Sequence, residues 1–439
     1  MKACGLMVLL VGPLAGAGMT DTWDVRIATV EPKVGSINPG ADFVVDATGT
    51  FHGCFASTEA SEDTVTYLRW TPGGLQERTK LSVKPRRTHT PKIALAPTGE
   101  PVVLFVDGDG VQLARKTQGS WSQESLSTYG HFEFADLSLA MDASGHAHVL
   151  FNGTNHIDSV YLRYMHEDEE GWITDDFVPA EPLYGNHGQY HDLALDPNGN
   201  PHIIYQESSG DSPYFPVKYV HRNTEGRFTT EVVSDYNNVM DMEMALGADG
   251  VIHVVHPYAN SYLSYCRRGL DGVWTEEQIQ DPATGMRIQF EHADIALENG
   301  VPTIGCKWSS KLTLITRAAG TWRFSEIRYP IGSFGPRLGP DHQERLCCIY
   351  ALGSGIGLIL PPVSHLPHVA ISPADGGGTM LGIEGLTPDT TYDLMRSTDL
   401  ANWTRIEEVS STSGSHEFEE PIPETPAFYR VELRPPPQD

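Results

Sequence analysis

Several histidines, tyrosines and carboxylates interrupt an otherwise regular strand pattern in this chain, and these residue types can transfer protons. They are Tyr190, His191, Asp241, His256, Tyr258, Glu291 and His292. A His or Tyr beside a carboxylate can act as a general acid or base, and a nearby Arg can pair with an acidic substrate group. The residue types therefore indicate acid–base chemistry, provided that the fold brings them together.

The element that must position them is a repeated hairpin, clearest in HDLALDPNGNPHIIY at residues 191–205. Two apolar runs flank a DPNG turn, in which Pro fixes φ and Gly accepts a positive φ. Related hairpins begin at Asp42, Lys92, Asp136, Glu243 and Asp294, with a weaker copy at Leu346. A spacing of roughly 50 residues is typical of propeller blades.

Each hairpin is followed by a third apolar run and an aromatic-containing fourth, which predicts four antiparallel strands in each unit. Six complete units run from about Asp42 to Ile327, and the seventh has only two clear strands. A lone strand at residues 22–30 could complete the last unit, because an unclosed ring exposes sheet edges. We therefore expect an all-β fold, a seven-bladed β-propeller over residues 18–365, with eight or six blades as alternatives.

The two ends of the chain differ from the repeat. Lys2, an apolar stretch and the small residues 15–17 predict a signal peptide at residues 1–17, and hence a secreted or cell-surface protein. Residues 366–434 predict a small C-terminal β-sandwich module, and residues 435–439 a disordered tail. No other stretch is long and apolar enough to predict a transmembrane segment.

Charge and cysteine content exclude some classes. The net charge of −27 argues against nucleic acid and anionic membranes as partners. Beyond the signal peptide the cysteines are Cys54, Cys266, Cys306, Cys347 and Cys348. They lack metal-site spacing, so we expect buried hydrophobes, with one disulfide between blades as the alternative. We expect no cofactor and no metal ligands; a structural calcium or zinc ion stays an alternative.

Residues shared by several hairpins indicate scaffold rather than chemistry. His52, His148, His202 and His253 each stand three positions after the turn glycine, where an imidazole could bond a neighbouring turn. Asp46, Asp142 and Asp196 fit turn acceptors of the Asx type.

The turn joins strands one and two at one end of each blade, so the start of strand one and the end of strand two meet at the other. Loops that converge there on a central channel commonly carry the ligand site. We expect Tyr190, His191, His256 and Tyr258 to be catalytic. The expected substrate-binding residues are His89, Asn186, His187, Asp241, Arg287, Glu291, His292 and Trp308.

The repeat resembles BNR-repeat and sialidase-like propellers. GADGVIHVVHPYANSYLSYCRR and HTPKIALAPTG are similar to propeller polysaccharide lyases of the ulvan-lyase type. This resemblance implies that His and Tyr transfer a proton at a uronate carbon while Arg or His neutralises the carboxylate. It matches His256 to the second His of the motif, His89 or His191 to the His that leads a strand one, and Tyr258 or Tyr190 to the Tyr. LTPDTTYDL resembles the end of fibronectin-type modules.

Two functions of different classes follow. The first is a polysaccharide lyase that cleaves an acidic, uronate-containing glycan by β-elimination. The alternative is a non-catalytic propeller that binds glycan or protein at the cell surface, and a sialidase-like glycoside hydrolase is a second alternative. The expected partner is a polysaccharide or glycan, and the sequence does not indicate an oligomeric state.

Overall fold

The computed structural model describes most of the repeat region and part of the C-terminal region. The described residues are 36–59, 62–71, 74–82, 90–127, 136–156, 159–175, 190–207, 215–223, 225–235, 242–258, 262–281, 284–288, 290, 292–308, 311–318, 320–327, 335–341, 345–352, 355–359, 368–373, 379–384, 391–397, 404–410, 415–420 and 428–433. The expected signal peptide, the strand expected at residues 22–30 and the tail at 435–439 lie outside them.

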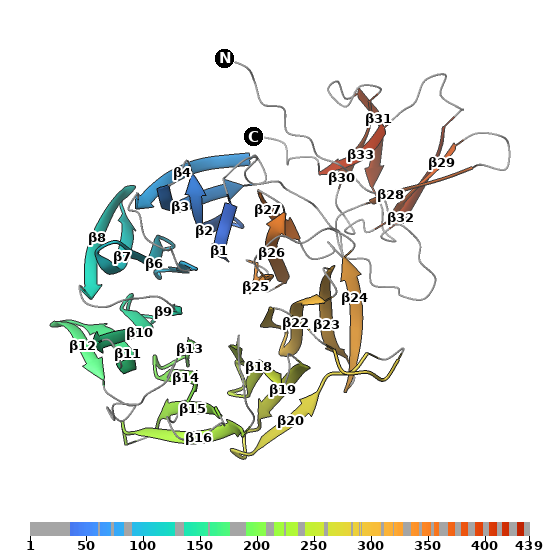
Figure 1. Ribbon diagram of the computed structural model, residues 1–439. Helices are drawn as coiled ribbons and strands as arrows, with labels where there is room; N and C mark the ends of the chain where they lie inside the picture. Colours follow the sequence, from blue (N-terminus) through green and yellow to red (C-terminus); the bar gives the residue numbers. More distant parts are fainter. Residues whose placement is uncertain are drawn as a thin grey trace. The chain divides into compact units, whose positions relative to one another are not determined.

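Six antiparallel sheets of four strands each follow one another along the chain (Figure 1). We number them as blades 1 to 6. Blades 1 to 3 consist of β1 Ser36–Val45, β2 Phe51–Glu59, β3 Glu62–Thr71 and β4 Gly74–Ser82; β5 Lys92–Leu95, β6 Pro101–Asp107, β7 Gly110–Thr117 and β8 Ser120–Ser127; and β9 Leu137–Met141, β10 Ala147–His156, β11 Ser159–Asp168 and β12 Gly171–Asp175. Blades 4 to 6 consist of β13 His191–Leu195, β14 Pro201–Gln206, β15 Val217–Arg222 and β16 Phe228–Ser234; β17 Glu243–Leu246, β18 Ile252–Tyr258, β19 Tyr262–Arg268 and β20 Trp274–Gln278; and β21 Ala293–Glu298, β22 Val301–Trp308, β23 Lys311–Ala318 and β24 Thr321–Ile327.

The expectation of seven four-stranded blades is corrected, because the residues that the structure describes form six. The place after blade 6 is taken by a three-stranded sheet of β25 Arg337–Pro340, β26 Leu346–Leu352 and β27 Gly355–Ile359. Strand β25 contacts β21 on one side and β1 on the other. The sequence after β27, PPVSHLP, is rich in proline, which cannot donate to a strand ladder.

The second compact unit, Pro362–Asp439, holds two three-stranded sheets. They consist of β28 His368–Pro373, β29 Thr379–Glu384 and β32 Ser415–Glu420, and of β30 Thr391–Ser397, β31 Thr404–Ser410 and β33 Phe428–Leu433. The β-sandwich expected for this region stays a prediction. Among the described residues, no helix has the length and hydrophobicity needed to cross a membrane.

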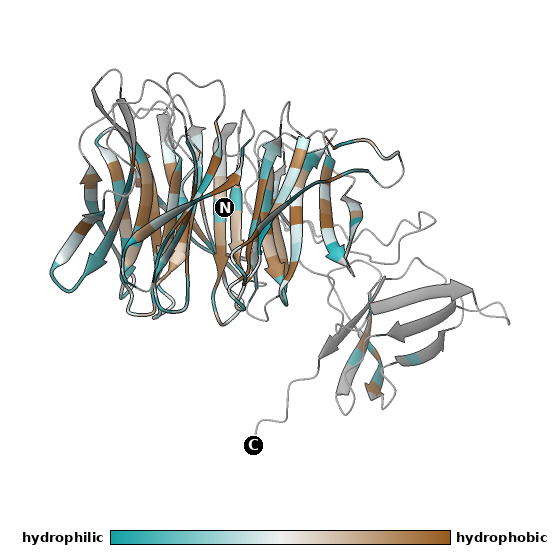
Figure 2. Ribbon diagram, turned by 90° about the horizontal axis from the view of Figure 1, so that it is seen from below, coloured by the Kyte–Doolittle hydropathy of each residue, from teal (hydrophilic) through white to brown (hydrophobic). Residues whose placement is uncertain are grey.

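The hydrophobic core lies between neighbouring blades. Phe55 and Leu68 of blade 1 pack against Cys347 and Ile349 of the three-stranded sheet, and equivalent clusters join the blades up to blade 6. Figure 2 shows hydrophobic residues concentrated within the strands and hydrophilic residues in the turns. Since each blade buries both faces, it depends on its neighbours for stability.

The hairpin turns form as their sequence predicts. Gly199 has a φ of 80°, a value that only glycine adopts without strain. The Asp196 carboxylate accepts hydrogen bonds from the backbone N–H groups of Asn198 and Asn200, both at 2.8 Å. Asp46 and Asp142 make the same pair of contacts, which confirms their structural role.

All five described cysteines are buried and free. Burial raises the pKa of the Cys306 thiol to about 12, which leaves it un-ionised at neutral pH. The expectation of buried small side chains is therefore confirmed, and no disulfide joins the cysteines that the structure describes.

Candidate functional site

Register places the start of strand one and the end of strand two at the same end of each blade. The Gln206 N–H donates to the Tyr190 carbonyl at 3.1 Å in blade 4, and the Lys307 N–H donates to the His292 carbonyl at 3.0 Å in blade 6. We call this end of blades 4 to 6 the rim. Its described residues include Tyr190, Gln206, Tyr262, Arg287, His292, Lys307 and Trp308.

Several expected site residues cannot be placed on the rim. His89, Asn186, His187, Asp241 and Glu291 lie outside the described residues. Tyr258 ends β18, where its backbone pairs with Tyr262, but its side chain lies outside the described part.

His191 is enclosed rather than presented to solvent. His191 is the first residue of β13, and it is only 2% exposed. The Nδ1 atom lies 3.1 Å from the Ser138 hydroxyl, and Nε2 lies 3.1 Å from the Asp136 carbonyl in blade 3. Burial lowers the pKa of His191 to about 4, so the ring is neutral at pH 7. These contacts join blades 3 and 4, and they occupy both ring nitrogens.

Tyr190 and His256 also point into packed surroundings. Tyr190 is half-buried and packs against the hydrophobic cluster between blades 4 and 5. His256 is 1% exposed, and its Nε2 atom lies 3.5 Å from the Cys266 sulfur and 3.9 Å from Glu276 Oε1. His253 and His256 point to opposite faces of β18, as the period of a strand requires.

The rim of blades 5 and 6 gathers an arginine and two aromatic side chains. Arg287 is exposed, and its guanidinium carbon lies 5.5 Å from the centre of the Tyr262 ring. Trp308 is half-buried and packs against the cluster that contains Leu263 and Ile288, the chain neighbours of Tyr262 and Arg287. Half-buried His292 directly precedes the adjoining inner strand, β21. Together these groups offer a positive charge and apolar ring surface at one end of two adjacent blades.

A ring of charged residues around the centre of the propeller is a feature that the sequence analysis missed. The innermost strands contact one another in sequence from β1 to β25 and back to β1 (Figure 1). Each of them has a charged residue within it or directly before it, at equivalent positions of the repeat. These residues are Asp42, Lys92, Asp136, Asp192, Glu243, Asp294 and Arg337. The sequence repeat could have revealed this ring. Five of the six complete hairpins begin with one of these charged residues, and in the sixth hairpin Asp192 directly follows the first residue, His191.

Residues of the charged ring form hydrogen bonds and an ion pair between inner strands. Asp42 accepts the Ile93 N–H at 2.9 Å, Asp192 accepts the Met244 N–H at 2.8 Å, and Asp294 accepts the Leu338 N–H at 2.6 Å. Burial raises the pKa of Asp294 to about 8 and also raises that of Asp192, while positive charge from Lys92 opposes both shifts. Arg337 forms an ion pair with Glu243. These contacts give the central residues a structural role.

The four repeated histidines have a common partner. The Nδ1 atom of each lies within hydrogen-bonding distance of a buried Tyr hydroxyl in strand three of its own blade, at 2.5–2.8 Å. The pairs are His52–Tyr67, His148–Tyr164, His202–Tyr219 and His253–Tyr265. The scaffold interpretation is confirmed, and His52 also reaches the turn carboxylate of Asp46 at 3.2 Å. The tyrosine partner was not predicted.

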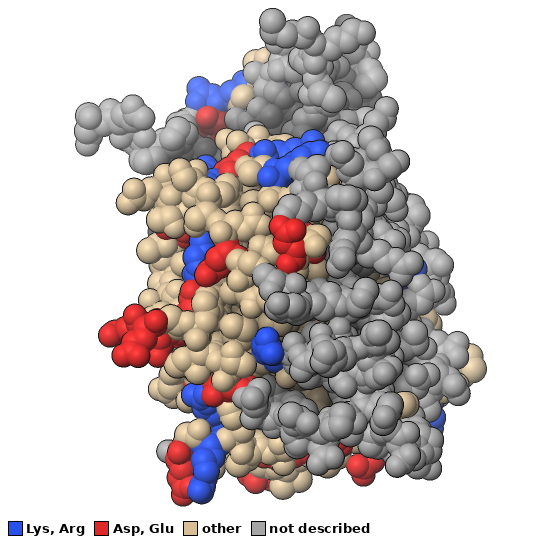
Figure 3. All heavy atoms as spheres, turned by 60° about the vertical axis from the view of Figure 1, so that its left-hand side comes forward, with Lys and Arg blue, Asp and Glu red and all other residues tan. Residues whose placement is uncertain are grey.

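The sides of the blades carry paired charges. Figure 3 shows Lys or Arg beside Asp or Glu on one flank of the molecule. Arg115 of blade 2 lies 2.5 Å from Glu167 of blade 3, and Arg268 of blade 5 lies 2.7 Å from Glu231 of blade 4. Such pairs link neighbouring blades through their outer strands.

Comparisons with known proteins find distant structural neighbours. Neither a family model nor a curated protein matches the sequence. Similar solved structures include the six-bladed lectin of Aleuria aurantia, at 14% identity and a TM-score of 0.44 over 65% of this chain and 94% of that one. The α-L-arabinanase of Penicillium chrysogenum is 13% identical, with a TM-score of 0.44 over 78% of this chain and 98% of that one. The polysaccharide lyase Uly1 is 10% identical, with a TM-score of 0.43 over 79% of this chain and 93% of that one. At these identities and TM-scores the similarity supports no conclusion about the activity of this chain.

Proposed function

We propose that the protein binds an acidic glycan at the rim of blades 5 and 6. The observation that carries this proposal is the exposed Arg287 guanidinium beside the Tyr262 ring, next to a cluster on which Trp308 packs. A guanidinium can hold a carboxylate or sulfate through two parallel hydrogen bonds, and an aromatic ring offers an apolar face to a sugar. In a chain with a net charge of −27, an anionic ligand needs such a local cation.

Enclosed histidines favour binding over catalysis as the first function to test. His191 and His256 are 2% and 1% exposed, and each has both ring nitrogens near a polar partner. A general base must reach the proton that it removes. A glycan bound on the rim would not reach either imidazole without rearrangement of the blade.

A polysaccharide lyase is the second candidate, and Tyr258 is the observation that favours it. The register of β18 and β19 pairs Tyr258 with Tyr262, so a second tyrosine stands at the strand end where Arg287 lies. In β-elimination a base removes the proton beside the uronate carboxyl group, and the glycosidic C–O bond breaks on the adjacent carbon. The products are an unsaturated uronate and a new reducing end. In this version Tyr258 transfers the proton and Arg287 pairs with the carboxylate.

The experiment combines binding and turnover on one polysaccharide panel. We would measure binding to acidic and neutral glycans, ultraviolet absorbance from unsaturated uronates, and new reducing ends. Binding restricted to acidic glycans, weakened at least tenfold by Arg287→Ala and less by Arg287→Lys, would support the proposal. Arg227→Ala is the matched control, because that exposed arginine lies in a turn at the opposite end of blade 4 and pairs with Glu225.

Each outcome has a distinct meaning. Binding that survives Arg287→Ala and Trp308→Ala would place the ligand elsewhere and overturn the rim proposal. Ultraviolet absorbance that rises together with reducing ends, and that Tyr258→Phe abolishes, would establish the lyase. Reducing ends without the absorbance would indicate a glycoside hydrolase, whose two carboxyl groups would need to lie about 5–10 Å apart.

We also propose that the protein is exported, because residues 1–17 have the features of a signal peptide. N-terminal sequencing of the mature protein from its native host would check this. A chain that retained Met1 and remained inside the cell would contradict it.

A further inference from the structure

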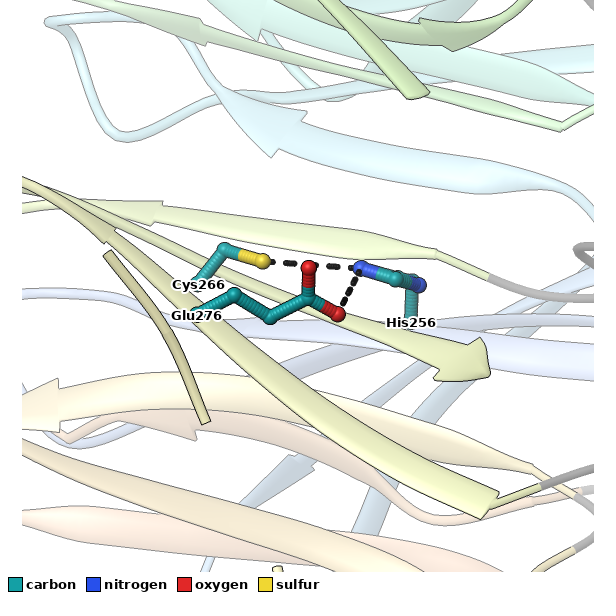
Figure 4. A group of neighbouring side chains, drawn as sticks. All are labelled: His256, Cys266 and Glu276. Carbon is teal, nitrogen blue, oxygen red and sulfur yellow. Dashed lines mark hydrogen bonds and ion pairs between the residues drawn. The ribbon is translucent and has the colours of Figure 1, made fainter. Parts of the chain in front are cut away.

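Three polar side chains meet on one face of blade 5, each supplied by a different strand. His256 lies on β18, Cys266 on β19 and Glu276 on β20 (Figure 4). Cys266 pairs directly with Glu276 and, on its other side, with Val254, two residues before His256. Because side chains two residues apart in a strand share a face, all three point the same way. That face packs against blade 4.

The donor atoms of the three side chains are close enough to share one ion. The imidazole nitrogen, the sulfur and a carboxylate oxygen all lie within 4.8 Å of one another. His256 Nε2 lies 3.5 Å from Cys266 Sγ and 3.9 Å from Glu276 Oε1. Two ligands of a tetrahedral zinc ion lie about 3.3–3.6 Å apart, given Zn–N, Zn–O and Zn–S bonds of about 2.0–2.3 Å. The two distances from His256 Nε2 therefore lie within a few tenths of an ångström of that range, and the third pair of donor atoms is within 4.8 Å.

The imidazole is held with its free electron pair toward the other two groups. His256 Nδ1 lies 2.9 Å from the Pro257 carbonyl, which can only accept, so the proton resides on Nδ1. Nε2 then carries the lone pair and faces the sulfur and the carboxylate. A hydrogen bond from the remote ring nitrogen to a carbonyl is the usual support of a metal-binding histidine.

The carboxylate is also held in place from outside the trio. Ser264 donates to Glu276 Oε1 at 2.5 Å, and Ser234 of blade 4 donates to Oε2 at 3.0 Å. The Glu276 side chain is 25% exposed, whereas His256 and Cys266 are fully enclosed. An ion from solvent can therefore reach the trio at the partly exposed Glu276 carboxylate.

We propose that His256, Cys266 and Glu276 form a zinc-binding site in blade 5, with a fourth position open to water or a further ligand. Nitrogen, thiolate and carboxylate are ligands of zinc, whereas calcium and magnesium prefer oxygen alone. On binding, the Cys266 S–H bond loses its proton to solvent and the sulfur bonds the metal. The thiolate and the carboxylate then cancel the two positive charges, which suits an enclosed site.

Cobalt spectroscopy tests this site independently of any glycan. The full-length protein, without a histidine tag, is stripped with a chelator and titrated with Co²⁺ and then with Zn²⁺. We expect one equivalent of Co²⁺ to give a thiolate-to-cobalt band in the near ultraviolet, which Zn²⁺ abolishes. Elemental analysis should find one zinc per chain.

Matched cysteine variants decide whether the signal comes from this trio. Cys266→Ala should abolish the band, while Cys306→Ala, which removes an equally buried thiol from blade 6, should leave it intact. Glu276→Gln should weaken Co²⁺ binding at least tenfold, and it serves as the test if Cys266→Ala does not fold. A wild-type protein without the band, a band that survives Cys266→Ala, or unchanged affinity in Glu276→Gln would overturn the proposal.

Discussion

The two faces of blade 5 use histidine in different ways, although the two residues are only three positions apart in β18. On one face, His253 Nδ1 lies 2.6 Å from the buried Tyr265 hydroxyl, as in three other blades. On the other face, His256 presents Nε2 to the thiol of Cys266 and the carboxylate of Glu276. The repeated histidine is a closed structural pair, whereas the unrepeated one has a lone pair directed at two metal-ligand groups.

The blades that lack the repeated histidine support this distinction. In blade 2 the equivalent positions are Val102 and Leu113, and in blade 6 they are Thr303 and Leu314. Both members of the pair are therefore replaced together. Removing one partner leaves a buried polar group unsatisfied, while replacing both avoids that cost.

The largest effect that we expect is a loss of folding stability in acid, because the contributions of four histidine rings add together. Burial lowers the pKa of His148, His191, His202 and His253 to about 4 each. Between pH of about 6.5 and 4 the unfolded chain binds protons that the folded chain does not, so the free energy of unfolding falls as pH falls. Each ring contributes about 1–3 kcal/mol. Urea unfolding at a series of pH values measures this, and a flat profile would contradict it.

Asp294 should make folding stability depend on pH in the opposite direction. Its folded pKa is raised to about 8, so the folded state holds a proton between pH of about 4 and 8 that the unfolded chain releases, and stability falls as pH rises through that range. Asp294→Asn keeps an acceptor for the Leu338 N–H but cannot titrate. The variant should lose less stability than wild type between pH of about 5 and 8.

Zinc should stabilise the wild-type protein by about 2.7 kcal/mol when its free concentration is a hundred times the dissociation constant. Thermal unfolding with zinc and with excess chelator measures the shift in melting temperature. Cys266→Ala should abolish the shift and Tyr265→Phe should retain it, because the two side chains lie on opposite faces of β19. A shift lost in both variants would mean that the faces are not independent.

Tyr164→Phe should destabilise the folded state by about 1–3 kcal/mol, because it leaves His148 Nδ1 without its partner. The double variant His148→Val with Tyr164→Leu copies the pair of blade 2 and should recover part of that loss. Chemical denaturation of the double variant, of His148→Val alone and of Tyr164→Leu alone completes the cycle. A double variant whose loss equals the sum of the two single losses would refute a coupled pair.

The smallest effect concerns the contact between blades 4 and 5. Ser234→Ala removes one hydrogen bond to Glu276 Oε2 and should cost about 0.5–1.5 kcal/mol. It should also weaken Co²⁺ binding, since the serine orients a proposed ligand. Ser325→Ala in blade 6 is a control distant from the trio.

Sequence reasoning went furthest where contacts are local. The hairpins, the glycine turns and the Asx contacts of Asp46, Asp142 and Asp196 all depend on residues a few positions apart. The scaffold role of the four histidines followed from their repetition, whereas their tyrosine partners, 12–17 residues away, were not predicted. The candidate site fared differently: His191 was placed at the start of a strand, but its partner Ser138 is 53 residues away in another blade. The seventh blade was expected to gain a strand from residues 22–30, which lie outside the described residues, and the sheet that the structure describes there has three strands.

The sequence by itself determined that the chain forms four-stranded hairpin units, because strand period, turn chemistry and repeat length act over short distances. It also showed that His256 breaks the repeat. Only the tertiary structure decided what that histidine meets, because Cys266 and Glu276 reach it through the register of three strands and Ser234 through the packing of blade 4 on blade 5. Likewise, the starting residues of the hairpins become a central charged ring only when the inner strands close around one axis.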